Sequence, residues 1–248
     1  MTPGKLAMVA VNIEPTSSAT FTLDQIFPTN ETTTAGGTLA DSDQLRTWDQ
    51  ENQKYRFFFR FWKTVGAANK AKCGHWTEDL LKTRDGVPED YPLANIALKA
   101  GDAVFYTAKA NDQTLTIPGQ VPNEASGVLK QGYNMVGVGF PAMWNPNDAG
   151  TNFWMNANFT CGGTAADADQ IRYWDEENQK FRFFFLFYKT VGAANKAKCY
   201  KWVEDLLKAR DGVPEDYPVL TESLNVGDGF FYIKKKEGEI EFKPGLKL

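Results

Sequence analysis

The feature that most constrains this chain is a long stretch that occurs twice. Residues 48–92 return as residues 174–218 at a constant offset of 126, and only eight of the paired positions differ. A duplication this close encodes the same local structure twice, so the chain divides naturally into repeats. We expect a first β module over residues 1–121, a linker over residues 122–132 and a second β module over residues 133–248.

The composition and the local patterns favour β structure. Aromatic residues make up 14 % of the chain, and aromatic side chains pack well on pleated sheets. Residues 43–49 alternate with period two, and a short polar turn leads into residues 54–65, which together predict a hairpin. We therefore predict an all-β, mainly antiparallel fold of two tandem duplicated modules, each sandwich-like or barrel-like with one short helix.

The remaining segments of the repeat allow more than one structure. Residues 66–73 are basic and short-chained, which predicts a loop or a weak helix. Residues 76–84 carry Leu80 and Leu81 at helical spacing from Trp76, which favours the short helix, with a strand as the alternative. In the return strand, positions 55, 57, 59 and 61 are predicted to face the core, leaving a mixed cationic and aromatic outer face. The linker is expected to be a tether lying against the surface.

Bulk properties exclude several classes of protein. The net charge is −4 with acids and bases interspersed, so no face is built for nucleic acid. No apolar run approaches the roughly 20 residues of a membrane-spanning helix, and the first residues lack the profile of a secretory signal. Three cysteines are too few for a disulfide scaffold. We expect Cys73, Cys161 and Cys199 to be idle thiols, with one bridge between modules as the alternative.

One pattern resembles a known class of module. The sequence DQIRYWD at residues 169–175 is followed by Gly227-Asp228, the strand sequence GFFYIKK and a closing Pro-Gly. This is similar to tandem β-rich repeat modules of bacterial secreted and cell-surface proteins, in which a DQI-x-x-WD hairpin precedes a G-x-G-F-[FW]-Y strand. The resemblance covers about half of each module. It implies a β fold and an extracellular or cell-surface location, and it carries no catalytic residues; the basic segment 66–73 departs from the pattern.

Residues that carry chemistry are sparse. The only histidine, His75, is replaced by Lys201 in the second copy, and phosphate-binding or zinc-protease motifs do not occur. We therefore predict that the protein is not an enzyme. Repeated aspartate pairs next to loop carbonyls could hold Ca²⁺, with turn capping as the alternative; they are Asp41, Asp43, Asp167 and Asp169. No other cofactor is expected.

The aromatic residues are the better candidates for binding. Indole and phenol rings in a row can form a platform on which the rings of a polysaccharide stack, whereas burial in a core is the alternative reading. The candidate binding residues are Trp48, Trp62, Trp76, Trp144, Trp154, Trp174, Tyr188 and Trp202.

The sequence KTVGAANKAKC is identical in the two repeats, although the first thirty or so residues of each copy have diverged. A surface used twice along one chain is what a linear assembly needs, with a recent duplication as the competing explanation. We predict a non-enzymatic, secreted or cell-surface structural protein that self-associates into a fibre, sheath or coat. The basic segments would meet the repeated acidic stretches of the next copy, which are Glu78-Asp79 and Glu89-Asp90 in the first repeat, through Lys70, Lys72, Lys196 and Lys198. The alternative is a carbohydrate-binding or adhesin pair that uses the aromatic residues and the unlike loops 16–37 and 142–163.

Overall fold

The computed structural model describes residues 2–16, 20–82, 90–114, 116–122, 127–150, 155–207 and 216–242. These residues form antiparallel sheets with a few short helices, which confirms the all-β prediction. No helix among them is long and apolar enough to span a membrane. The helices are α1 (Leu23–Ile26), α2 (Ala67–Lys70) and α4 (Ala193–Lys196).

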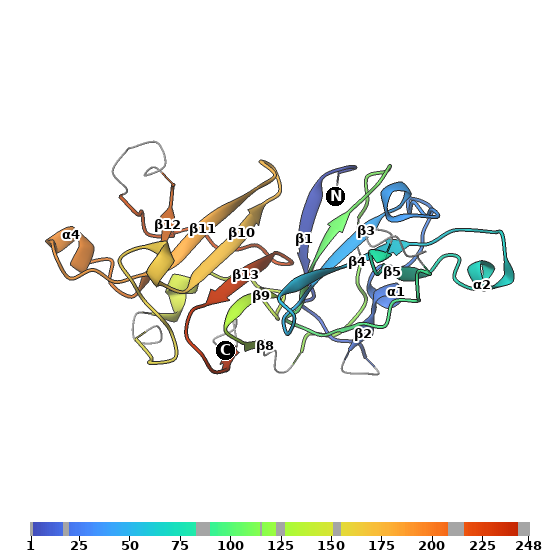
Figure 1. Ribbon diagram of the computed structural model, residues 1–248. Coiled ribbons are helices and arrows are strands. Elements are labelled where there is room, and N and C mark those ends of the chain that lie inside the picture. The colour runs from blue at the N-terminus through green and yellow to red at the C-terminus, as the bar shows by residue number, and fades with distance from the viewer. Residues whose placement is uncertain are drawn as a thin grey trace.

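Each repeat contributes one five-stranded antiparallel sheet, and the two sheets have the same strand order (Figure 1). The first sheet has the order β1 (Leu6–Ala10), β7 (Ala103–Thr107), β3 (Gln44–Asp49), β4 (Lys54–Arg60) and β5 (Trp76–Asp79). The second has the order β9 (Gly132–Gly137), β13 (Gly229–Lys234), β10 (Gln170–Asp175), β11 (Lys180–Phe187) and β12 (Lys201–Asp205). Two small ribbons complete the sheets: β2 (Phe21–Thr22) with β6 (Ala97–Leu98), and β8 (Gly127–Leu129) with β14 (Ile240–Phe242).

The predicted hairpin is present in both repeats. In β3 and β4, Trp48 pairs with Tyr55 and Asp49 with Lys54. The Asp49 carboxylate accepts hydrogen bonds from the side-chain amide of Asn52 and from the backbone N–H groups of Asn52 and Glu51, and these bonds hold its pKa below the ordinary value. Gln53 closes the turn with a positive φ of 50°. The turn therefore folds from local contacts alone, which is why its sequence predicted it.

The prediction for the two faces of β4 holds on one face and fails on the other. Phe59 and Phe61, expected in the core, are buried and pack on the ring of Tyr91. Phe58 and Arg60, expected on the outer face, point into the core of the first repeat, whereas Tyr55 packs against the second repeat. Both faces of the strand are therefore covered over residues 58–61, although one of them carries arginines.

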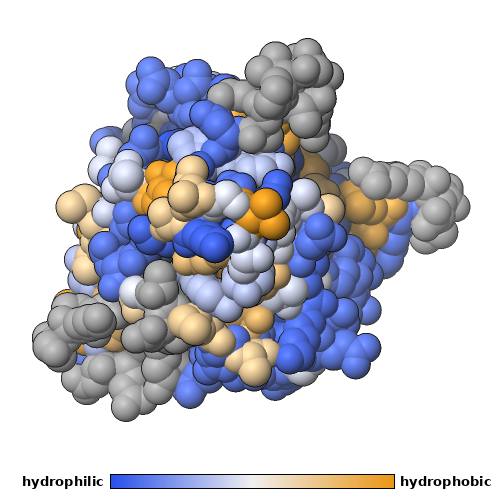
Figure 2. Space-filling model, turned by 90° about the vertical axis from the view of Figure 1, so that its left-hand side faces the viewer, coloured by the Kyte–Doolittle hydropathy of each residue, from blue (hydrophilic) through white to orange (hydrophobic). Residues whose placement is uncertain are grey.

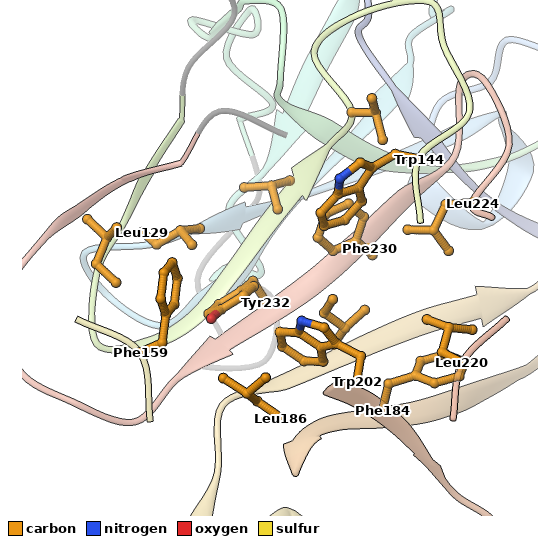
Figure 3. Close-up of a cluster of buried hydrophobic side chains, with 14 residues drawn as sticks. Leu129, Trp144, Phe159, Phe184, Leu186, Trp202, Leu220, Leu224, Phe230 and Tyr232 are labelled. Carbon is orange, nitrogen blue, oxygen red and sulfur yellow. The ribbon is translucent and has the colours of Figure 1, made fainter. Parts of the chain in front are cut away.

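The two repeat cores are built from different loops. In the first, the short helix α1 contributes Leu23 and Ile26. It begins with a capping box, in which the Gln25 N–H donates to the Thr22 hydroxyl and the Gln25 side chain accepts from the Thr22 N–H. In the second, Trp144 and Phe159 occupy this side of the sheet, packed with Trp202, Phe230 and Tyr232 (Figure 3). The sheets are thus alike where their loops are not.

Two predicted elements are corrected by the structure. Residues 76–79 form strand β5, paired with β4, so the predicted short helix over residues 76–84 is wrong in its described part; residues 83 and 84 lie outside the described residues. The linker is not a tether, because β8 pairs with β14 and Leu129 is fully buried in the second core. The weak-helix alternative for residues 66–73 is confirmed by α2.

The sheets of the two repeats pack on each other through reciprocal contacts. The indole N–H of Trp48 donates to the Tyr133 carbonyl at 2.8 Å, and that of Trp174 donates to the Leu6 carbonyl at 2.7 Å. Leu6 and Tyr133 occupy equivalent places in β1 and β9. At the strand ends, the Ala10 N–H donates to the Gly227 carbonyl, and the Gly137 N–H donates to the Gly101 carbonyl. The repeats are therefore not two separate sandwiches, since each sheet covers part of the other.

This interface predicts the effect of a single methyl group. A Cβ on Gly137 would lie 2.2 Å from the Cβ of Ala10, so Gly137→Ala should force the sheets apart and lower the free energy of unfolding by about 1–3 kcal/mol. Gly163→Ala is the matched control, because the nearest atom to its Cβ is 3.8 Å away, and it should change stability by less than about 0.5 kcal/mol. Urea titration measures both; equal stabilities would contradict the close approach.

Candidate functional site

The aromatic residues of the predicted binding platform do not form a row. Trp48 and Trp174 lie half-buried between the sheets, where their rings contact Phe231 and Phe105 respectively. Trp76 and Trp202 are fully buried in the repeat cores, and Trp144 is buried beside Phe230. A ring buried on both faces cannot stack on a sugar, so Trp76, Trp144 and Trp202 offer no platform, whereas Trp48 and Trp174 are taken up by the contact between the sheets.

Two of the candidate residues are exposed, and they are equivalent. The side chain of Trp62 is 52 % exposed and that of Tyr188 is 39 % exposed. Tyr188 directly follows β11, and Trp62 lies two residues after the end of β4, where the chain leaves the sheet. Trp154 lies outside the described residues. The exposed aromatic surface is thus confined, among the candidates described, to one ring per repeat.

The aspartate pairs serve the fold. Asp43 and Asp169 are fully buried: each accepts the hydroxyl of a core tyrosine, Tyr106 or Tyr232, and a backbone N–H of Lys109 or Lys235. The outer members, Asp41 and Asp167, accept the hydroxyls of Thr38 and Thr164 and cap short turns. No group of three or more His, Cys, Asp or Glu side chains suited to a metal occurs among the described residues. The turn-capping alternative accounts for the four residues, and the predicted Ca²⁺ site is not formed by them.

The near-identical segments form two projecting arms. We define the first arm as residues 62–73, which contain α2, and the second arm as residues 188–199, which contain α4. In both arms a glycine of positive φ, Gly66 at 87° or Gly192 at 86°, directly precedes the single helical turn. The arms lie at opposite ends of the molecule (Figure 1). The same surface is therefore presented twice, facing away from the shared interface.

Internal hydrogen bonds hold each arm in shape. The amide of Asn69 donates to the Val65 carbonyl at 2.8 Å, and Asn195 makes the same bond to Val191. The Cys73 thiol lies 3.3 Å from the Lys63 carbonyl and closes the base of the first arm. All three cysteines are free, so the interpretation of Cys73, Cys161 and Cys199 as unbridged thiols is confirmed. These internal bonds preorganise each arm.

The predicted self-association lysines divide into two kinds. Lys72 donates to the backbone carbonyls of Asp90 and Tyr91 at 2.7 and 2.9 Å, and Lys198 does the same for Asp216 and Tyr217. These two anchor the arms to their own repeats. Lys70 and Lys196 are exposed on the arms.

The acidic stretches expected to receive the lysines are also engaged within the chain. Glu78 accepts two hydrogen bonds from Arg56, both at 2.7 Å, and Asp90 pairs with Lys82 at 2.8 Å. Glu89 lies outside the described residues. Lys72, Lys198, Glu78 and Asp90 thus have partners within the chain, and the pairing of a basic segment with the acidic stretch of a neighbouring copy stays a prediction.

What remains exposed on the arms is largely apolar. Val65 is 74 % exposed and Val191 is 75 % exposed, although both are large aliphatic side chains. Small residues of the helical turns, such as Ala67 and Ala68, lie beside Val65 and are exposed as well. The end of the molecule that carries α4 shows apolar residues set among hydrophilic ones (Figure 2). Each arm thus presents a small apolar tip with a lysine next to it.

Comparison of the chain with protein-family models, curated proteins and solved structures finds no match. The resemblance to bacterial repeat modules stays a prediction. The sequence indicates the arms because the two segments are near-identical. It does not indicate their apolar tips, because the lysines are the more conspicuous residues of these segments.

The two kinds of lysine predict different effects of charge reversal. Lys72→Glu removes two charge-assisted hydrogen bonds and brings a carboxylate to two carbonyls, so it should lower the free energy of unfolding by about 1–2 kcal/mol. Lys70→Glu on the same arm is the control and should lie within about 0.5 kcal/mol of the parent. Thermal melts followed by circular dichroism compare them, and equal melting temperatures would show that the anchor is unimportant.

Proposed function

We propose that the protein is a non-enzymatic structural protein that self-associates through its two arms into a linear assembly such as a fibre, sheath or coat. The observation that carries this proposal is the presence of near-identical, apolar-tipped arms at opposite ends of one molecule. A molecule with two like binding ends extends in one dimension when one end binds another. As the resemblance to repeat modules implies, we place it outside the cell or at the cell surface.

The interface between the two repeats supports this proposal because it buries the aromatic faces of the sheets within the chain. The aromatic faces of the sheets, with Trp48, Tyr55, Trp174 and Phe181, are used within the chain. Their reciprocal arrangement is closed, so it cannot propagate to a further copy. Among the described residues, the pair of arms is a repeated surface that stays free, and burial of Val65 and Val191 there would supply the attraction.

The association of single molecules should be modest. Full burial of one aliphatic side chain contributes roughly 1.5–3 kcal/mol of favourable free energy. Two arms that meet offer two valines, and each arm adds the ring of Trp62 or Tyr188. Ordering costs are small because the arms are already held by Asn69 and Asn195. Lys70 and Lys196 lie beside the tips, so like-charge repulsion opposes the contact. Raising the salt concentration should therefore strengthen it, since screening acts within about 10 Å at 0.1 M.

Charge placed on the tips tests the proposal. Val65→Glu or Val191→Glu should cap one end, so each single variant should stop at dimers joined through the intact arm. The double variant should be monomeric, while the parent forms a concentration-dependent ladder. Met143→Glu is the matched control: this residue is also an exposed large apolar side chain, but it lies in a loop outside the arms. Analytical ultracentrifugation resolves these species, and a double variant that still forms the ladder would refute the arms as the contact.

Carbohydrate binding is a second proposal, supported by the exposed, equivalent rings of Trp62 and Tyr188. A single ring per repeat could stack on one sugar, and two rings at separate ends could engage one long polysaccharide. Titration with a panel of soluble polysaccharides should then shift the tryptophan fluorescence of the parent and leave that of Trp62→Phe much less changed. Unaltered emission with every glycan would exclude it.

A further inference from the structure

Among the eight differences between residues 48–92 and 174–218, one places a charge in a core. Arg60 stands where the second repeat has Leu186, and its side chain is only 1 % exposed. Its guanidinium donates to Asp24 at 2.7 Å and to the Gly74 carbonyl at 2.8 Å, both from Nη1, and to the Phe27 carbonyl from Nη2. It also lies 4.4 Å from the ring centre of Trp76. The first repeat thus holds a cation at a position that the second repeat fills with an aliphatic side chain.

The guanidinium of Arg60 keeps one N–H group that forms no hydrogen bond with the described residues. Its Nε is buried and has no hydrogen-bond partner among the described residues. In Arg56, on the same strand, the Nε and Nη2 edge grips both oxygens of Glu78. That edge is the geometry that suits a carboxylate. In Arg60 the same edge keeps an open donor, and a buried donor without a partner is costly.

A cavity of about 170 Å³ lies at this place. Its floor is formed by buried side chains, namely Phe27, Arg60, Trp76, Tyr106 and Gln113. Its rim is exposed and polar, with Asn30, Thr114 and Thr116. A cavity of about 150 Å³ is large enough for a benzene ring, so this one accommodates a small organic molecule.

At the corresponding place in the second repeat, the described side chains form an apolar cluster. Phe159 and Leu186 pack there with Leu129 and Tyr232 (Figure 3). In the first repeat Phe159 is matched by Thr33, and Ile240 of the second core is matched by Thr114. Each of these changes shortens an apolar side chain and adds a hydroxyl. Together with Arg60 they convert a packed apolar core into a hollow with a cationic floor.

We propose that this cavity binds a small aromatic carboxylate, whose carboxylate is held by Arg60 and whose ring lies against Phe27 and Trp76. A single negative charge matches the site, because Asp24 already pairs with Arg60 and Asp43 bonds to the Tyr106 hydroxyl on the floor. A phosphate dianion meets both aspartates and is disfavoured. The aromatic walls select a ligand with an apolar body, as in most small-molecule sites.

Benzoate is the probe, and isothermal titration calorimetry of the full chain is the measurement. Benzoate should bind, whereas benzyl alcohol, of similar shape without the charge, and inorganic phosphate should bind at least about tenfold more weakly. Arg60→Lys keeps the charge but loses the planar fork, so it should also weaken benzoate binding at least about tenfold.

A second variant separates ligand binding from the structural contacts of Arg60. Thr33→Phe installs the residue that the second repeat has at this position and should fill the cavity, which abolishes binding while Arg60 and its partners stay intact. Its melting temperature should be at or above that of the parent, since the added ring buries apolar surface. No heat with benzoate at millimolar concentration, binding equal to that of benzyl alcohol, or undiminished binding by Thr33→Phe would each overturn the proposal.

Discussion

The pair of indole hydrogen bonds across the centre of the molecule is the contact on which the rest depends. Trp48 donates to the first strand of the second repeat and Trp174 donates to the first strand of the first. Gln53 and Gln179 reinforce the contact, because each bonds to both backbone groups of Tyr133 or Leu6. The hairpin of each sheet therefore forms hydrogen bonds with the edge strand of the other sheet. A tryptophan that satisfies its N–H in this way also buries its ring among Phe105 and Phe231.

This reciprocity explains why duplication of one segment produced a single body. A hairpin that binds the opening strand of its neighbour needs a neighbour with the same strand, and a second copy supplies it. The opening strands themselves differ, LAMVA against GYNMVG, yet Met8 and Met135 both pack in the shared cluster. The backbone carbonyls of Leu6 and Tyr133 serve as acceptors whatever the side chain is. Contact through the main chain tolerates sequence divergence that contact through side chains would not.

Sequence predicted the elements whose causes are local and missed those with distant causes. The hairpins follow from alternation and from a turn capped by Asp49. The helix predicted over residues 76–84 failed, because Trp76 is drawn into the core by Phe27 and pairs in register with Arg60, and neither partner is near in sequence. The outer face predicted for β4 was wrong at Phe58 and Arg60 for a similar reason. Both of its faces are covered, so alternation fixed the strand without fixing which side is inside.

The unpredicted burial of Arg60 also explains why the sequence did not indicate the candidate ligand site. As long as position 60 was assigned to the outer face, an arginine there required no explanation. Once Arg60 is known to point into the core, its exchange with Leu186 becomes the most informative difference between the two copies, and Thr33 and Thr114 gain meaning with it. The aromatic residues show the opposite error. They were predicted to form an exposed platform, whereas many of them bury the two sheets against each other.

Internal contacts explain part of the identity between the arms, and the remainder locates the shared function. Asn69, Lys72 and Cys73 each bond within their own repeat, as do Asn195, Lys198 and Cys199, so the fold itself requires them. Val65 and Val191 are different, because three quarters of each side chain faces solvent. Exposing a valine stabilises nothing, and a polar residue would be accepted there at little cost. Identity at these two tips therefore rests on something outside the fold: a recent duplication, or a surface that both ends of the molecule use in the same way.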